Sequence, residues 1–279
     1  MCEFCVKHGE GKKWYLQAKN YAEDLWSDLR RRRMTADFFN NFNVTMSRNL
    51  ANLDRLARAP RFVQAIVRGV VTRQQKKTHF GQVVPIEDVE RIFEFTDSVT
   101  RTPCVCRRVT RGREDRYCFG VTMGPTGGLI GQVVDPSYWQ GPDGVGAERL
   151  DKPTALQMMK DFESEGLVHS VWTFVTPFIG GICNCDRTDC IAMRTTVGAG
   201  VPVMFKGEYV ASVDWDKCTG CRSCMRVCQF GAIGYSAGPR KASIDALHCY
   251  GCGVCRSVCK QEAIALRDRA SVPLVAGNW

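Results

Sequence analysis

Two short segments near the C-terminus carry four cysteines each. They are CTGCRSCMRVC, from Cys218 to Cys228, and CYGCGVCRSVC, from Cys249 to Cys259, with two, two and three residues between successive cysteines. Thiolate sulfur is a soft ligand that suits zinc, copper and iron–sulfur clusters. An iron–sulfur cubane needs one thiolate for each of its four irons, and three cysteines at this spacing can wrap one side of it on a single turn. The segments therefore predict two such clusters.

Zinc is the competing interpretation of these segments. Structural zinc sites favour two separated CxxC pairs with four ligands in total, which is fewer cysteines than the two runs supply. The fourth cysteine of each run lies beyond the reach of its own loop, and in bacterial runs of this kind it ligates the other cluster. We therefore predict two [4Fe–4S] clusters, one held by Cys218, Cys221, Cys224 and Cys259, the other by Cys249, Cys252, Cys255 and Cys228.

The two runs belong to an internal repeat. Residues 213–235 align with residues 244–266 at an offset of 31, and each unit is predicted to form a strand, a cysteine loop, a short helix and a second strand. The repeat resembles the bacterial two-cluster ferredoxin family over about 60 of the 279 residues. The resemblance implies a ferredoxin-like fold and electron transfer. The sequence departs from the pattern of that family at Gln229 and Lys260, which stand where the family usually has proline after each fourth cysteine.

Six more cysteines lie in the middle of the chain: Cys104, Cys106, Cys118, Cys183, Cys185 and Cys190. A CxC pair is a poor chelate for one ion, but it can serve two iron atoms or two neighbouring sites. Cys190 is predicted to start a helix, whose N-terminus stabilises a thiolate. The arrangement is similar to those of cluster-rich ferredoxin-like proteins of anaerobes, which implies an additional iron–sulfur cluster.

Three interpretations of these six cysteines remain open. The first is one extra [4Fe–4S] cluster held by Cys183, Cys185, Cys190 and one of Cys104 or Cys106. The second is a larger or double cluster that uses all six. The third is zinc or inert buried thiols, since free cysteine is common in protein cores.

The N-terminus offers one further candidate metal site. Cys2, Cys5 and His8 follow each other at intervals of three residues. Two thiols and one imidazole are one ligand short of a closed zinc site, so a fourth ligand must come from elsewhere. Terminal cysteines that bind nothing are the alternative.

The elements that position these residues indicate an α+β protein in three regions. Residues 1–81 are predicted to be a basic helical region, with one helix over residues 12–32, another from a cap at Thr35 or Asp37 to Pro60, and a third over about residues 61–77. Residues 82–206 predict a mixed α+β domain, including paired strands over 116–123 and 127–134, a helix over 152–166 and a strand over 168–175. Residues 207–279 hold the two-cluster ferredoxin-like repeat.

The net charge of +9 is concentrated in the N-terminal region, where 16 Lys and Arg face 7 Asp and Glu. Basic helices predict docking of redox partner proteins. The run Arg30–Arg33 is also a feature of nucleic-acid binders. No recognition motif accompanies it, so no nucleic-acid partner is predicted. The N-terminal residues lack the apolar core of a signal peptide. The longest apolar stretch, residues 171–183, is shorter than the about 20 residues that span a bilayer. We expect a cytoplasmic protein without direct membrane insertion.

The absence of several common enzyme motifs narrows the range of possible functions. The sequence has no GxGxxG after a predicted strand, no GK[ST] phosphate loop and no GxSxG elbow, so no complete active site is recognisable. The prediction is an iron–sulfur electron-transfer protein, a subunit of an anaerobic redox enzyme complex that passes low-potential electrons to or from a partner. The alternative is an enzyme, or an enzyme-activating component, with a reactive additional cluster, single or double, in the middle domain.

Overall fold

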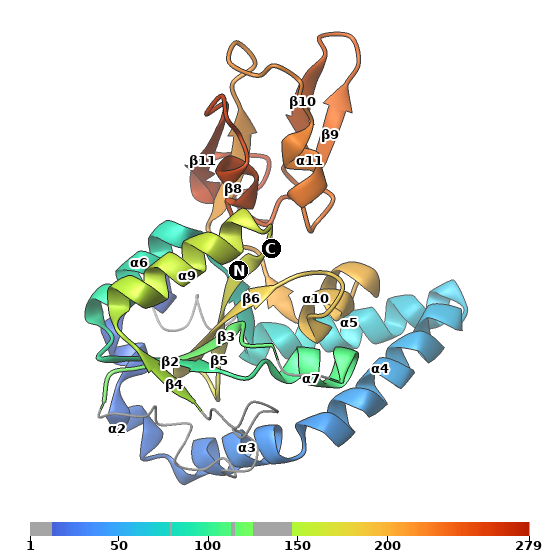
Figure 1. Cartoon of the computed structure of the whole chain (residues 1–279). Coiled ribbons are helices and arrows are strands. Elements are labelled where there is room, and N and C mark those ends of the chain that lie inside the picture. Colours follow the sequence, from blue (N-terminus) through green and yellow to red (C-terminus); the bar gives the residue numbers. More distant parts are fainter. Residues whose placement is uncertain (1–12, 79, 113–114, 125–146, 279) are drawn as a thin grey trace.

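The computed structural model describes residues 13–78, 80–112, 115–124 and 147–278 (Figure 1). The candidate N-terminal ligands Cys2, Cys5 and His8 lie outside the described residues. The chain combines helices and strands, as predicted, with a helical N-terminal part and a C-terminal repeat of strands and short helices. Among the described helices, none has both the length and the apolar character that crossing a bilayer requires.

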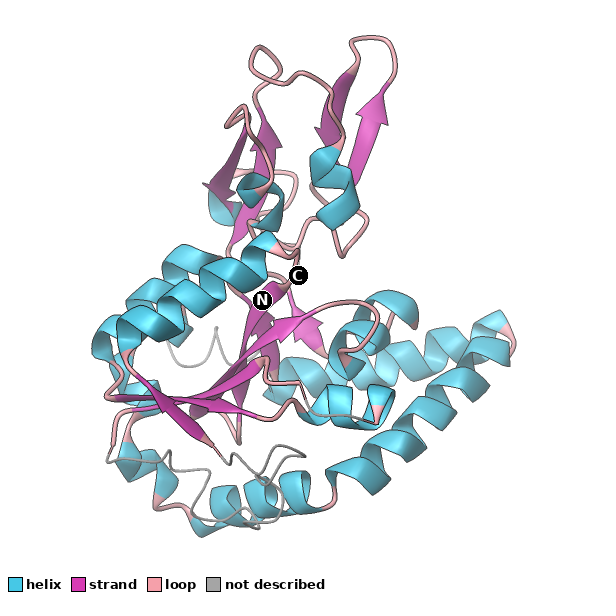
Figure 2. Cartoon of the chain, in the orientation of Figure 1, coloured by secondary structure: helices cyan, strands magenta, loops and turns pink. Residues whose placement is uncertain are grey.

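A seven-stranded sheet forms the centre of the molecule (Figure 2). Its strand order is β4-β2-β3-β6-β5-β1-β7, and only the β1–β7 pair is parallel among these described strands. The strands are β1 Gly81–Val83, β2 Ser98–Thr102, β3 Cys118–Thr122, β4 Glu148–Leu150, β5 Val168–Thr173, β6 Ile179–Cys185 and β7 Met204–Phe205. Strands were predicted at β3 and β5. The expected partner of β3 over residues 127–134 lies outside the described residues, and β3 pairs with β2 and β6.

One face of the sheet is covered by helices α6 (Ile86–Phe95) and α9 (Lys152–Ser164), which lie side by side in Figure 1. Helix α9 begins where the Asp151 carboxylate accepts the Thr154 N–H, and it ends before Gly166, whose φ of +93° suits glycine, as predicted. Val99, Phe119 and Ile182 pack against these helices in the main core. Because strand side chains alternate, the residues next to them point to the opposite face.

The opposite face meets the N-terminal helices. These are α2 Glu23–Trp26, α3 Leu29–Asn40, α4 Phe42–Arg58 and α5 Arg61–Thr78, preceded by the 3₁₀ turns η1 Trp14–Leu16 and η2 Ala18–Tyr21. Three short helical elements follow later in the chain: α7 Val105–Arg111, α10 Ile191–Met193 and the π turn η4 Arg194–Gly198. In Figure 1, α4 and α5 form an antiparallel pair whose outer ends extend beyond the sheet.

The predicted helix start at Thr35 is wrong. Helix α3 already begins at Leu29, because the Asp28 carboxylate caps it by accepting the N–H groups of Arg30 and Arg31. The buried Arg31 side chain donates to the carbonyls of Phe174 and Val175, which ties this helix to the sheet domain. The predicted helix over residues 12–32 is correspondingly broken, in its described part, into short turns before Leu29.

The C-terminal repeat folds as predicted, with a strand, a cysteine loop, a short helix and a strand in each half. Strand β8 (Tyr209–Val213) pairs with β11 (Ile264–Asp268), and β9 (Ile233–Ser236) pairs with β10 (Lys241–Ile244). Helices α11 (Ser223–Val227) and α12 (Val254–Ser257) follow the cysteine loops, and the 3₁₀ turn η5 (Arg269–Ser271) follows β11.

The repeat is docked on the end of α6 and α9. Arg256 forms an ion pair with Glu87 at 2.7 Å, and the Tyr209 hydroxyl donates to the buried Asp88 carboxylate at 2.9 Å. The Ser257 hydroxyl donates to the carbonyl of Glu163 in α9 at 3.3 Å. These contacts hold the second cysteine loop close to the sheet domain.

Candidate functional site

Both C-terminal cysteine loops turn at a glycine that no other residue could replace without displacing backbone. Gly220 and Gly251 have φ values of +70° and +72°. A Cβ at Gly220 would lie 2.1 Å from the Arg240 carbonyl oxygen, and one at Gly251 would lie 2.1 Å from that of Tyr209. The chain therefore packs directly against the backbone of each loop, which leaves the cysteine side chains on the inner side.

The two halves exchange their fourth cysteines. One small cavity is lined by Cys218, Cys221, Cys224 and, from the other half, Cys259. In the second loop, burial and repulsion from Cys249 and Cys228 raise the pKa of Cys255 above its ordinary value, so Cys228 lies near the second group. The structure thus brings Cys259 to the first loop and Cys228 to the second, and the assignment of these groups as ligands of two clusters stays a prediction.

The sulfurs of these loops accept backbone hydrogen bonds at equivalent positions. The N–H of Ala232 points to Cys228 Sγ at 3.3 Å, and the N–H of Ala263 points to Cys259 Sγ at 3.4 Å. The N–H of Ala211 points to Cys249 Sγ at 3.4 Å. Such donors stabilise anionic sulfur and tune the potential of iron–sulfur clusters. An all-thiol donor set with N–H support fits the cluster chemistry that the spacing indicates.

The comparison with protein families agrees with this geometry. Residues 217–264 match the family model of the 4Fe-4S dicluster domain. This segment is a ferredoxin-type iron–sulfur domain. A comparison with curated proteins finds no match. From here on, residues 207–279 are called the ferredoxin domain.

The sheet brings the six middle cysteines together on one face. Cys183 and Cys185 lie two residues apart on β6, so both side chains project from the same side of the sheet, with their Cα atoms about 7 Å apart. Cys118 on β3 is paired in register with Cys183. Cys104 caps α7, Cys106 lies in its first turn, and Cys190 precedes α10. We call these residues the six-cysteine set: Cys104, Cys106, Cys118, Cys183, Cys185 and Cys190.

Within this set the sulfurs form two groups of three. Cys183 Sγ is 3.4 Å from Cys118 Sγ, and Cys118 is also hydrogen-bonded to Cys104. Cys190 Sγ is 3.1 Å from Cys185 Sγ, and Cys190 is hydrogen-bonded to Cys106. We call these groups the Cys118 trio (Cys104, Cys118, Cys183) and the Cys190 trio (Cys106, Cys185, Cys190). Each CxC segment contributes one cysteine to each trio.

Burial makes it unfavourable for the thiols of this set to ionise as isolated anions. Hydrogen bonding to Cys118 and burial raise the pKa of Cys104 well above its ordinary value. The hydrogen bond between Cys183 and Cys118 lowers the pKa of Cys183, but burial and the neighbouring Cys185 outweigh it and raise that pKa to about 12. As thiolates, these six sulfurs would need positive charge beside them, which a cluster of iron ions would supply. In the described residues no three His, Cys, Asp or Glu side chains are arranged as a one-ion site, in the ferredoxin loops or here.

A buried arginine lies beside the Cys118 trio. Arg107 Nη1 is 3.6 Å from Cys104 Sγ and donates to the carbonyl of Asn184 at 3.3 Å. Its guanidinium pairs with Asp186 and lies over the Tyr117 ring. Burial lowers the pKa of Arg107, but attraction to Cys104 and Asp186 raises it further, so the net shift is upward. Sequence reasoning missed this residue, although an arginine directly after a CxC segment is a usable signal.

The loop between β6 and Cys190 is held rigidly from both sides. Asp186 Oδ1 accepts the N–H groups of Thr188 and Asp189, and the Cys190 N–H donates to the Asp186 carbonyl. Behind β6, the buried His169 ring contacts Asn184 Oδ1 at 2.6 Å. Burial lowers the pKa of His169 to about 4, so the ring is neutral. The Cys190 trio therefore rests on a fixed backbone.

The six-cysteine set and the ferredoxin domain share one packed cluster of side chains. Cys228 and Cys252, predicted ligands of the second ferredoxin cluster, pack in it together with Cys185 and Cys190. Other members of this cluster are Val168, Val254 and Phe230, whose ring stacks on Tyr250 at 3.9 Å. Gln229 spans the same boundary, since its Oε1 accepts the Arg187 N–H and its Nε2 donates to the Gly166 carbonyl.

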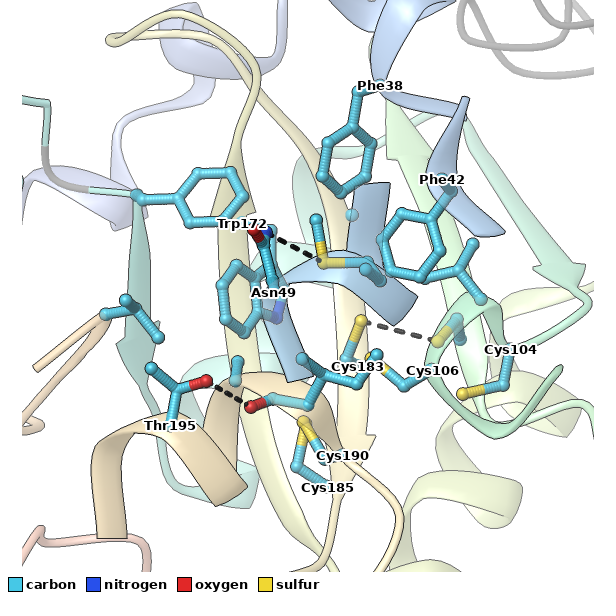
Figure 3. Close-up of a pocket in the computed structure, with 18 of the residues that line it drawn as sticks. Phe38, Phe42, Asn49, Cys104, Cys106, Trp172, Cys183, Cys185, Cys190 and Thr195 are labelled. Atoms are coloured by element: carbon cyan, nitrogen blue, oxygen red, sulfur yellow. Dashed lines mark hydrogen bonds between the residues drawn. The ribbon is translucent and has the colours of Figure 1, made fainter. Parts of the chain in front are cut away.

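A cavity of about 740 Å³ opens against the six-cysteine set. In Figure 3 the labelled cysteines of this set lie on one side of the cavity, and the rings of Phe38, Phe42 and Trp172 lie on the other. Further walls come from α4 and α5, including Leu53 and Val67.

Proposed function

We propose that this protein is an iron–sulfur electron carrier in which the ferredoxin domain passes electrons to a third centre held by the six-cysteine set. The observation that carries the proposal is the shared packing of Cys228 and Cys252 with Cys185 and Cys190. When loaded, iron–sulfur clusters accept and release one electron at a time, which is the chemistry they supply here.

The residues around the third centre suit that role. The two trios offer six soft ligands, and Arg107 adds a buried cation that favours the more reduced, more negative state. Val168, Val254 and Phe230 exclude water between the second ferredoxin loop and β6. Gln229 fixes the distance across this boundary.

The exposed end of the ferredoxin domain suits a redox partner. Cys221 is exposed, whereas Cys218 and Cys224 of the same loop are buried. Arg222 and Arg226 lie beside it, and Arg222 packs over the Tyr235 ring. Electrons would therefore enter here from an acidic partner protein, the first ferredoxin loop lying outermost and the six-cysteine set innermost.

The first experiment counts iron and acid-labile sulfide in anaerobically purified protein. Two ferredoxin clusters alone give about eight irons per chain, one further cubane gives about twelve, and two loaded trios give more. We expect more than eight, with an additional EPR signal after reduction. About eight irons with full ferredoxin signals would remove the third centre from the proposal.

The second experiment tests the order of electron flow. Cys252→Ser removes a predicted ligand of the second ferredoxin cluster, and Cys118→Ser removes one from the Cys118 trio. After rapid mixing with reductant, freeze-quench EPR should show slower reduction of the third centre in the first variant and an altered third-centre signal in the second. Equal rates in wild type and Cys252→Ser would contradict the route.

A second candidate function is favoured by the cavity against the six-cysteine set. An electron carrier needs no space beside its terminal centre, whereas an enzyme needs room for a small molecule. In this alternative the third centre reduces a bound substrate and the ferredoxin domain supplies the electrons. Turnover of a small molecule by the isolated, reduced protein distinguishes the two functions.

A further inference from the structure

The cavity beside the six-cysteine set is built into the sheet itself. Gly120 on β3 and Gly181 on β6 are paired in register directly beyond the pair Cys118 and Cys183. Both glycines line the cavity, and neither carries a side chain to fill it. The volume of about 740 Å³ falls within the about 300–1,000 Å³ typical of small-molecule sites.

The walls of the cavity are rich in aromatic rings from separate elements. The Phe38 ring on α3 lies 6.1 Å from both Phe80 and Phe174, and Trp172 lies 5.1 Å from Phe80. Val67 on α5 adds an aliphatic wall. Ring edges and faces set at such distances suit the flat surface of an aromatic ligand.

The scarcity of unpaired charge on the lining excludes a strongly charged occupant. Among the described lining residues, Arg55 and Arg107 carry charge and no carboxylate is present. Arg107 is already paired with Asp186, and Arg55 contacts Asn52 at the exposed surface of α4. The interior offers no counter-ion for a carboxylate, phosphate or ammonium group deep in the cavity.

Besides Arg107 Nε, which faces the Asp189 carboxylate at 3.8 Å, two buried polar atoms of the described lining residues have no hydrogen-bond partner. One is the hydroxyl of Thr100 on β2, which is 3% exposed, and the other is Oε1 of Gln75 on α5. Buried polar groups are nearly always paired, and leaving one unpaired is costly. A hydroxyl or amine on a bound molecule would satisfy either atom.

We infer that this cavity is a binding chamber for an uncharged, mainly aromatic small molecule that bears one hydroxyl or amine group. The cysteines occupy only one side of it, and the lining continues as far as Leu56 and Val63. Space therefore remains beside a centre held by the two trios. The inference deepens the proposed function, because it names the class of molecule that meets the third centre, but the chamber is defined by the chain's own side chains.

Binding of naphthalene derivatives to the anaerobic holoprotein tests the inference. We expect 2-naphthol to bind with one-to-one stoichiometry in titration calorimetry. The anionic 2-naphthalenesulfonate should bind at least about tenfold more weakly, because the only cation in the buried part of the described lining, Arg107, is already paired with Asp186. Saturating 2-naphthol should also change the EPR line shape of the third centre. Equal binding of the two probes, or no binding of either, would contradict the inference that the cavity is such a binding chamber.

Variants on one helix separate the chamber from the surface. Val67→Trp fills the cavity and should weaken 2-naphthol binding by about tenfold or more. Val70 lies on the exposed side of the same helix, so Val70→Trp should leave binding unchanged. Equal effects of the two variants contradict the inference, as does a change of molecular mass in place of a change in affinity, which would indicate a second chain as the occupant.

A conservative variant remains informative if Val67→Trp fails to fold. Thr100→Val keeps the shape of the side chain and removes its hydroxyl. It should abolish the preference for 2-naphthol over naphthalene and leave naphthalene binding unchanged. Saturable 2-naphthol binding to protein that contains only ferredoxin iron would support the chamber and contradict the third centre. A complete third-centre signal without saturable binding would do the reverse.

Discussion

The side chain of Gln229 accepts a hydrogen bond from the backbone N–H of Arg187 at 3.1 Å. Gln229 directly follows the last cysteine of the first ferredoxin run, and Arg187 lies in the loop between Cys185 and Cys190. A second bond from Gln229 Nε2 reaches the Gly166 carbonyl at 2.9 Å. The residue that replaces the usual proline of two-cluster ferredoxins is thus a direct link between the ferredoxin domain and the six-cysteine set.

Replacing Gln229 with leucine should weaken this link without emptying the clusters. Each hydrogen bond contributes about 1 kcal/mol net, so the thermal midpoint should fall modestly, and reduction of the third centre should slow severalfold. Freeze-quench EPR and calorimetry measure the two effects. Lys260→Leu is the matched control, since Lys260 is the exposed equivalent in the second half. Equal slowing in both variants would contradict a specific role.

Arg107 should set the potential of the third centre. Arg107→Met removes the cation beside Cys104 and should lower the midpoint potential by about 60 mV or more, a tenfold change for a one-electron couple. Asp186→Asn removes the opposing negative charge and should raise it. Arg107→Lys tests whether charge alone suffices. Anaerobic redox titration followed by EPR gives the values, and shifts of the same sign in Arg107→Met and Asp186→Asn would be inconsistent with this account.

Glu163 should make stability fall as pH rises. Burial raises the pKa of Glu163 from 4.5 to about 7, although nearby Arg256 opposes the shift. Between these values the folded state holds more protons than the unfolded state, so the free energy of unfolding decreases with rising pH and the loss is complete above pH 7. The full effect is at most about 3 kcal/mol.

Glu163→Gln should remove this dependence. Relative to wild type, the variant should gain stability between pH 5 and pH 8 in anaerobic denaturant titrations. The adjacent Glu165 is exposed, so Glu165→Gln serves as the control. A stability difference between wild type and Glu163→Gln that stays constant over this pH range would show that Glu163 does not titrate there.

Gly220→Ala should cost the ferredoxin domain one cluster. The new Cβ meets the Arg240 carbonyl and requires the loop to shift, so the protein should lose about four irons and part of its visible absorption. Gly231→Ala is the control, because Gly231 has a φ of +65° but open space around it. That variant should keep its iron and lose only about 1 kcal/mol of stability. Equal iron loss in both would assign the effect to backbone strain.

The ferredoxin domain could be predicted from the sequence because its determinants are local. Cys218 and Cys249 begin two runs of identical spacing, and Gly220 and Gly251 mark the turns. Each feature falls within a dozen residues, so spacing alone carries the information. The predicted exchange of Cys228 and Cys259 follows from the duplication of the run.

The site in the sheet domain depends on pairing between distant strands. The six cysteines could be grouped from the sequence, but their division into two trios follows from the register of Cys118 with Cys183, 65 residues apart. No local pattern encodes that register. The start of α3 was missed although its signal is local, since the Asp28 carboxylate caps the helix by accepting the N–H groups of Arg30 and Arg31. The cavity arises where α3–α5 meet the glycines of β3 and β6.

Cys183 and Cys185 lie two residues apart on β6, and their shared face has a consequence for how the protein matures. A slip of one residue in the pairing of β6 would turn both thiols to the opposite face, against α9. The six sulfurs therefore converge only after the strands have found their register, and the finished sheet is the template on which the proposed third centre would be assembled. The ferredoxin loops gather their cysteines within one short repeat and need no such register. Under the proposed function, iron would therefore reach the sheet domain after the ferredoxin domain.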